Sequence, residues 1–232
     1  MTSTGPESST EGLLAIWHDV APGSETLVRD WYNEEHHAER LMVPGFLSAH
    51  RYQRASGEGT AIMTLYRTVD PDVLWSAPYR ERLQRPSDRT RAVMPVYRNM
   101  CRTACRIAWS TGVADGGAVA VLAVADDPRP SDRQWERLST ALQATPAMPG
   151  VLRYRWIVRV APQDRDGPTA EPNLRSTPDS EIAWALLVDA GHEHEALDGL
   201  ARIEQQIGPL PADDARIRQR ACYRLLYASY RQ

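Results

Sequence analysis

The stretch "MVPGFLSAHRYQ" (residues 42–53) returns later in the chain as "MPGVLRYRWIV" (residues 148–158). When the two Pro-Gly pairs are aligned, "LLAIWHDV" (residues 13–20) falls on "AVAVLAVA" (residues 118–125) without a gap. Two further pairs follow in the same order: "AIMTLYR" (61–67) with "IAWALLV" (182–188), and "CRTACRIAW" (101–109) with "CYRLLYASY" (222–230). Self-similarity on this scale is the signature of a repeated structural unit, so it indicates that the two halves share one fold.

Each half reads strand, helix, strand, strand, helix, strand. Apolar and alternating runs predict the strands, and longer stretches with helix start and stop signals predict the helices. The first-half strands are residues 13–20, 48–54, 61–67 and 98–109, and the helices are 24–42 and 71–92; the second-half helices lie near 131–144 and 193–207. This β-α-β-β-α-β order is that of a ferredoxin-like unit.

We therefore predict an α+β fold of two ferredoxin-like units in tandem, residues 12–112 and 113–232. A four-stranded antiparallel sheet with both helices on one side leaves its other face bare, so the two sheets should pack face to face as an α/β barrel within one chain. Strand residues on both sheet faces should then be buried: Leu14, Ile16, Val119 and Val121. Residues 1–11 are predicted to be disordered, and residues 161–181, rich in Pro, Asp and Gly, to form an exposed, flexible loop.

The stretch "WYNEEHHAERLMVPGFLSAHRYQ" (residues 31–53) resembles part of the dimeric α/β-barrel superfamily, particularly its EthD-like and muconolactone-isomerase-like branches. Those proteins often show an aromatic pair, Glu-His, Glu-Arg-Leu, Pro-Gly-Phe and then a strand rich in Arg and Tyr. The resemblance covers residues 13–67 in sequence and the rest in architecture. It implies a barrel of paired ferredoxin-like sheets. The superfamily includes lactone isomerases, polyketide cyclases, cofactor-free monooxygenases, haem enzymes and proteins without known activity, so the fold does not decide the function.

Composition narrows the partners and the compartment. The 232 residues carry 27 basic and 30 acidic side chains and a net charge of −3, which predicts no nucleic-acid partner. No apolar run approaches the ~20 residues that cross a bilayer, and the N-terminus does not resemble a secretory signal. Three cysteines, an odd number, fit a reducing cytoplasm. We expect a cytoplasmic protein that binds a small molecule, with room for a homodimer through its outer surfaces.

Histidines distinguish the two halves. At aligned positions the second half has no counterpart for four histidines, a tyrosine and a glutamate of the first: His18, His36, His37, His50, Tyr32 and Glu35. Core positions stay apolar in both halves. This asymmetry predicts that the first half carries the active site and that the second half is chiefly a structural partner, although drift on an exposed surface produces the same asymmetry.

Helical geometry separates the acids and histidines of residues 30–42. At ~100° per residue, Glu35 lies on the apolar, sheet-facing stripe and His36 at its border, four residues after Tyr32. An acid on such a stripe is costly unless it is paired, protonated or open to a cavity. His37 points the other way and is predicted to be solvated. The alternative for Glu35 is an ordinary charged helix surface.

Three further candidates lie on strands. His18 ends the first strand, where a polar side chain can face the mouth of a cleft, or can simply be a hydrogen-bonded edge histidine. His50 and Tyr52 share one face of the second strand and Arg51 lies on the other. The alternative for this pair is the polar side of an amphipathic strand.

Metal and cofactor sites are not predicted. Neighbouring residues on a helix diverge, so His36 and His37 cannot bind one metal from a regular helix. No zinc, nucleophile-elbow or phosphate-loop motif occurs. Some duplicated members of the resembled superfamily bind haem through one histidine, which here would be His192 or His194.

Three functions are compatible with these residues. The first is a cofactor-independent enzyme that acts on a small, hydrophobic, oxygenated molecule (a polyketide, aromatic compound or lactone) by isomerisation, cyclisation or dehydration. His36 would be the base, oriented by Glu35 or Tyr32, with three candidate enolate donors: His18, His50 and Tyr52. The second is a non-enzymatic or stress-associated barrel that holds a ligand in the same cavity. The third is a haem-binding barrel enzyme.

Overall fold

The computed structural model describes residues 10–125, 136, 140, 148–161, 169–207 and 216–231. Its strands are β1 (Gly12–Val20), β2 (Phe46–Glu58), β3 (Ile62–Thr68), β4 (Tyr97–Thr111), β5 (Ala118–Val124), β6 (Val151–Arg159), β7 (Trp184–Ala190) and β8 (Ile217–Tyr230). Its helices are α1 (Glu25–Trp31), η1 (Tyr32–His36), α2 (His37–Leu41), η2 (Pro71–Trp75), α3 (Ala77–Gln84), α4 (Asp88–Val93), η3 (Met94–Val96), η4 (Pro172–Leu174) and α6 (Glu193–Ile207). Each predicted strand is present near its predicted position. The helix predicted near residues 131–144 lies almost entirely outside the described residues.

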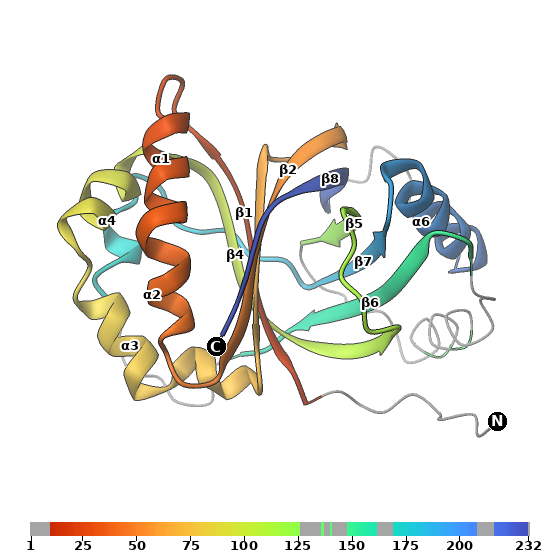
Figure 1. The fold of residues 1–232 in the computed structure, drawn as a ribbon, viewed down its shortest axis with the longest axis horizontal. Helices are drawn as coiled ribbons and strands as arrows, with labels where there is room; N and C mark the ends of the chain where they lie inside the picture. Colours follow the sequence, from red (N-terminus) through yellow and green to blue (C-terminus); the bar gives the residue numbers. More distant parts are fainter. Residues whose placement is uncertain are drawn as a thin grey trace.

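The strands form a closed antiparallel barrel in the order β1-β3-β2-β8-β5-β7-β6-β4 (Figure 1). Two seams join the halves of the chain: β2 pairs with β8, where Arg51 lies opposite Tyr227, and β4 pairs with β6, where Ile107 lies opposite Ile157. The predicted face-to-face packing is therefore corrected in one respect, because the sheets also meet edge to edge. Backbone hydrogen bonds at the seams leave no sheet edge open, which is what closure of a barrel achieves.

Both faces of β1, β5 and β7 are covered. On β1, Leu13, Ala15 and Trp17 belong to the core inside the barrel, whereas Leu14 and Ile16 pack under the helices. The four residues predicted to be buried are at most 7% exposed: Leu14, Ile16, Val119 and Val121. This prediction is confirmed.

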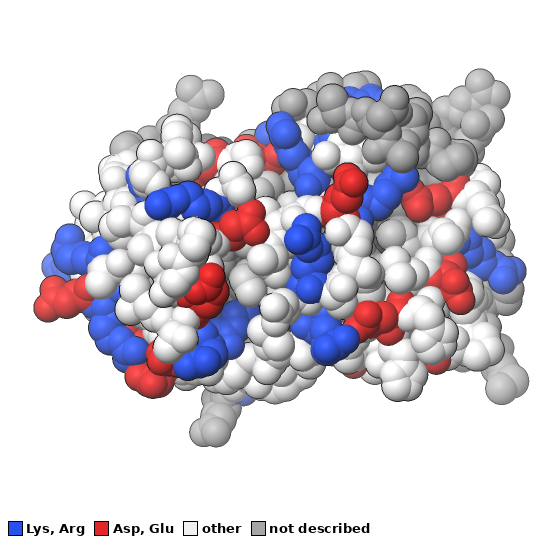
Figure 2. Space-filling model, turned by 90° about the horizontal axis from the view of Figure 1, so that it is seen from above, with Lys and Arg blue, Asp and Glu red and all other residues white. Residues whose placement is uncertain are grey.

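Helices cover the barrel from two sides. In Figure 1, α1 to α4 form a layer over β1 and β4, and α6 lies at the opposite end of the molecule, against β5 and β7. Within the described residues, no helix is long and apolar enough to cross a membrane. On the face seen in Figure 2, basic and acidic side chains are interspersed rather than separated into regions of one sign.

The described part of the segment 161–181 is exposed at Ser176, Thr177 and Pro178, as its composition predicts, but it is also anchored to the first half. Glu171 is only 7% exposed, and its N–H donates to the Leu83 carbonyl at the end of α3. Farther along, the Ser180 N–H donates to the Met100 carbonyl of β4. Residues 169–181 therefore pack against the helical layer of the first half, where the Glu171 carboxylate meets a buried arginine.

Candidate active site

The helix that carries most of the predicted site residues contains a π-helical turn. Residues Tyr32–His36 (η1) join α1 to α2, and the His37 N–H donates to the Tyr32 carbonyl, five residues back. A π turn holds one more residue than an α turn. Side chains five apart therefore share a face, and Trp31 lies above His36 as Tyr32 lies above His37.

This turn corrects two predicted orientations. His37, predicted to be solvated, is 0% exposed. Glu35, predicted on the sheet-facing stripe, leaves 25% of its side chain exposed, accepts a hydrogen bond from Ser87 Oγ and lies 3.9 Å from Arg89 Nε. The prediction assumed ~100° per residue along the whole helix, and the extra residue in η1 breaks that phase. Glu35 therefore contacts the start of α4 and is not part of the histidine cluster.

His18 and Tyr32 form the first contact of a buried layer between the sheet and the helices. His18 Nδ1 lies 3.2 Å from the Asp19 carbonyl, and Nε2 lies 3.1 Å from the Tyr32 hydroxyl. Since a carbonyl can only accept, Nδ1 carries the proton and Nε2 accepts from Tyr32. The ring of Tyr97 packs edge-on against His18 at 4.4 Å. His18 thus faces the helices, and the neutral form of its ring satisfies both of its nitrogens.

His37 lies between two tyrosine rings. It stacks on Tyr32 at 4.9 Å and on Tyr227, from β8, at 4.8 Å. Its Nδ1 is 3.1 Å from the Tyr66 hydroxyl, whereas its Nε2 is buried and has no hydrogen-bond partner among the described residues. His37 therefore keeps one ring nitrogen available to a ligand.

His36 is held differently. Its ring stacks on Trp31 at 3.9 Å, and it is 5% exposed. Its Nδ1 makes no hydrogen bond and lies 4.0 Å from Glu39 Oε2. Neither His50 nor Tyr52 contacts this layer.

Burial sets the protonation state of the layer. Burial lowers the pKa of His18 to about 4. Burial, with the nearby charge of Arg51, lowers the pKa of His37 to about 3. Burial also lowers the pKa of His36 and raises the pKa of the Tyr32 and Tyr66 hydroxyls. The layer at neutral pH thus consists of neutral imidazoles and neutral phenols.

Arg51, like Arg40, is a buried arginine that reaches this layer. Its guanidinium lies over the rings of Tyr32 at 5.1 Å and Tyr227 at 5.8 Å. Its Nη2 donates to Asn33 Oδ1 at 2.7 Å and its Nη1 to the Arg29 carbonyl at 3.4 Å. Arg51 is 4% exposed, yet no carboxylate in the described part of the chain pairs with it. A buried charge without a counter-charge is costly, so this position favours an anion.

The second half contributes to the layer. Tyr227 reaches it from β8, and Glu171 pairs with Arg40 of α2 through Nη2 and Oε2, 2.5 Å apart, with both side chains at most 9% exposed. The second half is therefore more than a covering for the first. The sequence predicted the face of the strand on which Arg51 lies but gave it no role, and nothing in the sequence indicates that Tyr227 comes close to it or that Glu171 pairs with Arg40.

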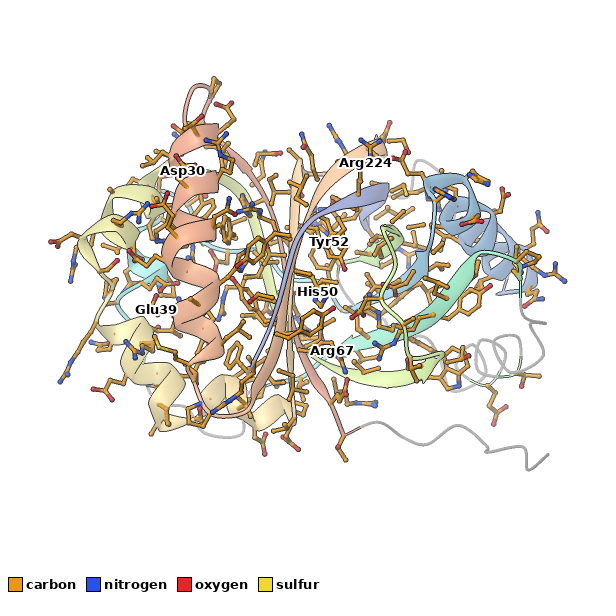
Figure 3. All side chains as sticks on the ribbon, viewed as in Figure 1. Asp30, Glu39, His50, Tyr52, Arg67 and Arg224 are labelled. Carbon is orange, nitrogen blue, oxygen red and sulfur yellow. The ribbon has the colours of Figure 1, made fainter. Side chains whose placement is uncertain are left out.

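His50 and Tyr52 lie on the other side of the sheet, inside the barrel. Figure 3 shows them on the barrel side of β2, away from Glu39 on the helix. His50 Nε2 lies 3.2 Å from the Tyr230 hydroxyl and 3.4 Å from Asp115 Oδ2. Nearby, Arg155 and Asp189 form two fully buried hydrogen bonds of 2.6 and 3.0 Å. His50 and Tyr52 share a face as predicted, but the structure does not bring them together with His18, Tyr32 or His36.

The described residues hold no group of three or more metal-binding side chains. His192 and His194, the candidate ligands under the haem-binding alternative, are exposed at the start of α6, with ring centroids 5.9 Å apart. A haem bound there would lie on the surface instead of in an enclosed pocket, so these residues do not fit the group.

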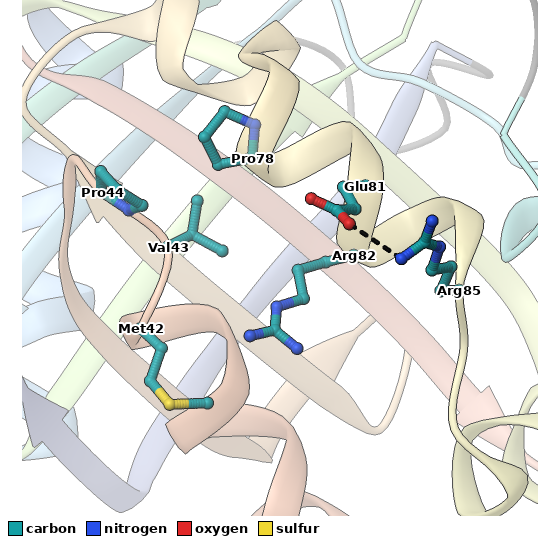
Figure 4. Close-up of a pocket in the computed structure, with 7 residues that line it drawn as sticks. All are labelled: Met42, Val43, Pro44, Pro78, Glu81, Arg82 and Arg85. Carbon is teal, nitrogen blue, oxygen red and sulfur yellow. Dashed lines mark hydrogen bonds and ion pairs between the residues drawn. The ribbon is translucent and has the colours of Figure 1, made fainter.

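Among the described residues, two pockets on the surface are lined by side chains other than the buried histidines. One, of about 300 Å³, lies between the α2–β2 turn and α3, where Glu81 and Arg85 form an ion pair across 3.0 Å (Figure 4). The other, of about 440 Å³, is lined by Arg102 and Arg218 together with the end of the 169–181 segment. The histidine layer itself is closed to solvent in this conformation.

Comparison with known proteins supports the fold. No protein-family model matches the chain, and no curated protein matches it. An anthrone oxidase-like protein is similar in structure, with a TM-score of 0.57 and 9% identity over 97% of this chain and 94% of that one. A candidate monooxygenase from Fusobacterium nucleatum has a TM-score of 0.55 and 13% identity, over 97% of this chain and 96% of its own. Chlorite dismutase from Candidatus Nitrospira defluvii has a TM-score of 0.50 and 7% identity, over 95% of this chain and 92% of its own.

The chain shares the fold of the anthrone oxidase-like protein and of the candidate monooxygenase. Its membership of the dimeric α/β-barrel superfamily, which the sequence resemblance implies, stays a prediction. The identities are too low to carry over an activity. Assignment to the EthD-like or muconolactone-isomerase-like branch stays a prediction.

Proposed function

We propose that the chain is a small-molecule enzyme that removes a proton beside a carbonyl group of a hydrophobic, oxygenated substrate. One observation carries the proposal: His37 Nε2, which has no hydrogen-bond partner among the described residues, lies in the same closed layer as Arg51, a buried cation that no carboxylate of those residues pairs with. Both contact the rings of Tyr32 and Tyr227. His37 would take the proton, and Arg51 would stabilise the enolate oxygen that results.

The electrostatics of the layer suit this step. An imidazole with a low pKa is neutral and ready to accept a proton, but it is a weak base while it is alone with Arg51. When a substrate becomes an enolate, the new negative charge offsets that of Arg51 and favours the imidazolium. In a layer buried from solvent these charges interact more strongly than in solution. Proton removal and anion stabilisation would therefore assist each other.

The other predicted residues take different positions in this proposal. His36 is the second candidate base, because its Nδ1 is also unpartnered. Tyr32 is a candidate donor to the enolate, held by its hydrogen bond to His18. Glu35, His50 and Tyr52 have no part in it, because their contacts lie outside the layer.

Reaction of the enolate with oxygen is the fate that we propose. The names of similar structures, an anthrone oxidase-like protein and a candidate monooxygenase, favour it. In such a reaction a CH₂ group beside an aromatic ring and O₂ give a C=O group and water, so the substrate supplies both electron pairs and no bound cofactor is required. Return of the proton to another atom is the alternative, and would give the isomerisation, cyclisation or dehydration predicted from the sequence.

The proposed organisation of the chain is a tandem duplication. The strand order β4-β1-β3-β2 in the first half and β8-β5-β7-β6 in the second supports it, as do the aligned sequence repeats. The single histidine-rich layer would then be the site that one copy kept.

The experiment is a substrate panel of anthrones, lactones and polyketide-like aromatics, followed by product analysis and oxygen uptake. On a substrate found in this way, His37→Ala should lower kcat about 10²–10⁴-fold and Arg51→Met about 10²–10³-fold. His36→Ala tests the second base, and His192→Ala, on the exposed start of α6, is the matched control. Full activity of both His37→Ala and Arg51→Met would remove the mechanism.

A binding protein with the same layer is the alternative to an enzyme. A ligand that copurifies and is recovered unchanged after incubation, with no member of the panel converted, would favour it. In that case the layer binds its ligand selectively and does not convert it.

A further inference from the structure

Two more buried nitrogens on the same helix lack hydrogen-bond partners in the described part of the chain: Arg40 Nη1 and His36 Nδ1. Arg40 is 2% and His36 5% exposed. They are four residues apart, so their side chains are neighbours on the buried face. Unsatisfied buried polar atoms are rare because they cost free energy, and a ligand atom is one way of satisfying them.

The charges around Arg40 differ from those around Arg51. Arg40 Nη2 is bound to the buried carboxylate of Glu171, which neutralises its charge. Glu39 lies 4.0 Å from His36 Nδ1. A ligand carboxylate at this point would be repelled by both acids, whereas a neutral oxygen could accept from Arg40 without disturbing the pair.

The two arginines also lie on opposite sides of the histidine pair. Arg51 binds Asn33 and the Arg29 carbonyl, toward the start of the helix, whereas Arg40 lies one turn beyond His36, beside Tyr79. Aromatic rings lie between them, including those that stack on His36 and His37.

We propose that Arg40 Nη1 and His36 Nδ1 form a second subsite, which holds a neutral carbonyl or hydroxyl oxygen of the substrate. This inference rests on the proposed function and specifies its substrate class: a flat aromatic molecule with one oxygen that ionises at Arg51 and a second, neutral oxygen at its other end. Glu171, from the second half of the chain, is a positioning residue, because it fixes one arm of Arg40 and leaves the other free.

A matched pair of ligands tests the subsite without turnover. 6-Acetyl-2-naphthol has an ionisable hydroxyl and a distant ketone, whereas 6-ethyl-2-naphthol lacks the ketone. We expect the full-length protein to bind the acetyl compound about tenfold more tightly, the effect of one hydrogen bond to a charged donor. The absorbance of the naphtholate anion shows whether the naphthol hydroxyl ionises beside Arg51, and it is measured independently of the two affinities.

Arg40→Lys keeps the charge opposite Glu171 but lacks the second arm of the guanidinium. It should reduce the preference for the acetyl compound to about twofold or less and leave binding of 6-ethyl-2-naphthol unchanged. If Arg40→Lys fails to fold, His36→Phe keeps the stacking on Trp31, removes Nδ1 and should weaken the same preference. His192→Ala should change neither affinity.

The subsite is overturned if the unaltered protein binds the two naphthols equally tightly, or binds neither of them. It is also overturned if Arg40→Lys loses the same affinity for both compounds. These results leave the proposed function to its own test, because proton removal at His37 does not require the second oxygen. Conversely, a clear preference for the acetyl compound with no turnover of any substrate would keep the subsite and remove the enzyme.

Discussion

His18, His36 and His37 are buried as neutral imidazoles, and this links their burial to stability. In the unfolded chain a histidine takes up a proton below pH ~6.5. In the folded chain burial lowers the pKa of His18 to about 4 and that of His37 to about 3. Between these values the unfolded state binds more protons than the folded state, so the free energy of unfolding falls as the pH falls.

The first prediction at this scale concerns that pH dependence. Between pH 7 and pH 5, His18 and His37 should each contribute about 2 kcal/mol of lost stability. Denaturant unfolding at the two pH values measures the loss. His18→Gln should lower stability at pH 7 and reduce the difference between the two pH values, whereas exposed His192→Gln should leave the difference unchanged. A stability that does not vary from pH 7 to pH 5 would mean that the imidazoles are hydrated.

Residue identity could be predicted at this scale, but contacts could not. The absence of His18, His36 and His37 from the second half indicated where polar chemistry is concentrated. The partners of these histidines come from residues distant in sequence, such as Tyr66 and Tyr227. Arg51 shows the limit, because its lack of a carboxylate partner is a property of the folded neighbourhood and not of its strand.

The π turn determines the site at the scale of the helix. Trp31, Tyr32, His36 and His37 can all face the sheet because η1 contains one residue more than an α turn. Amphipathic periodicity predicted the existence and length of the helix correctly, since the flanking turns are regular. It could not predict the phase beyond residue 32, because π turns have no simple sequence signal and a polar stretch such as "NEEHH" fits either winding.

A deletion pair tests this account. Deleting Glu34, which is exposed in η1, should convert the π turn to an α turn and leave both histidines facing the sheet, with little change in Tm. Deleting Ala38, which is exposed in α2, should rotate Arg40 and Leu41 out of the interface. The unpaired Glu171 carboxylate would then cost about 3–5 kcal/mol. Thermal unfolding of the two variants measures the contrast, and equal losses would contradict the role of the turn.

At the scale of the molecule, the sequence repeat predicted eight strands in two similar sets, and the barrel has β4-β1-β3-β2 beside β8-β5-β7-β6. The repeat could not predict how the sheets meet. Long β2 and β8 overlap from Ser48 to Glu58, and the seam places Tyr227 beside Arg51. Barrel closure therefore brings residues of the second half into the candidate site. The uneven distribution of histidines between the halves gave no sign of this contribution.

The last prediction concerns this closure. Residues 1–116 contain β1 to β4 but lose the partners of both outer strands, since β2 pairs with β8 and β4 with β6. Leu13, Trp17 and Leu65 would also lose the opposite wall of their core. A second copy could restore both seams by pairing β2 of one chain with β4 of the other, because β4 and β8 hold equivalent positions in the strand order.

Expressed alone, the fragment should therefore aggregate or form a homodimer, and coexpression with residues 117–232 should yield a soluble one-to-one complex instead. Light scattering after size exclusion measures each state. A stable, soluble monomer of residues 1–116 would mean that the first half needs no partner sheet, and the contribution of Tyr227 to its site would then be incidental.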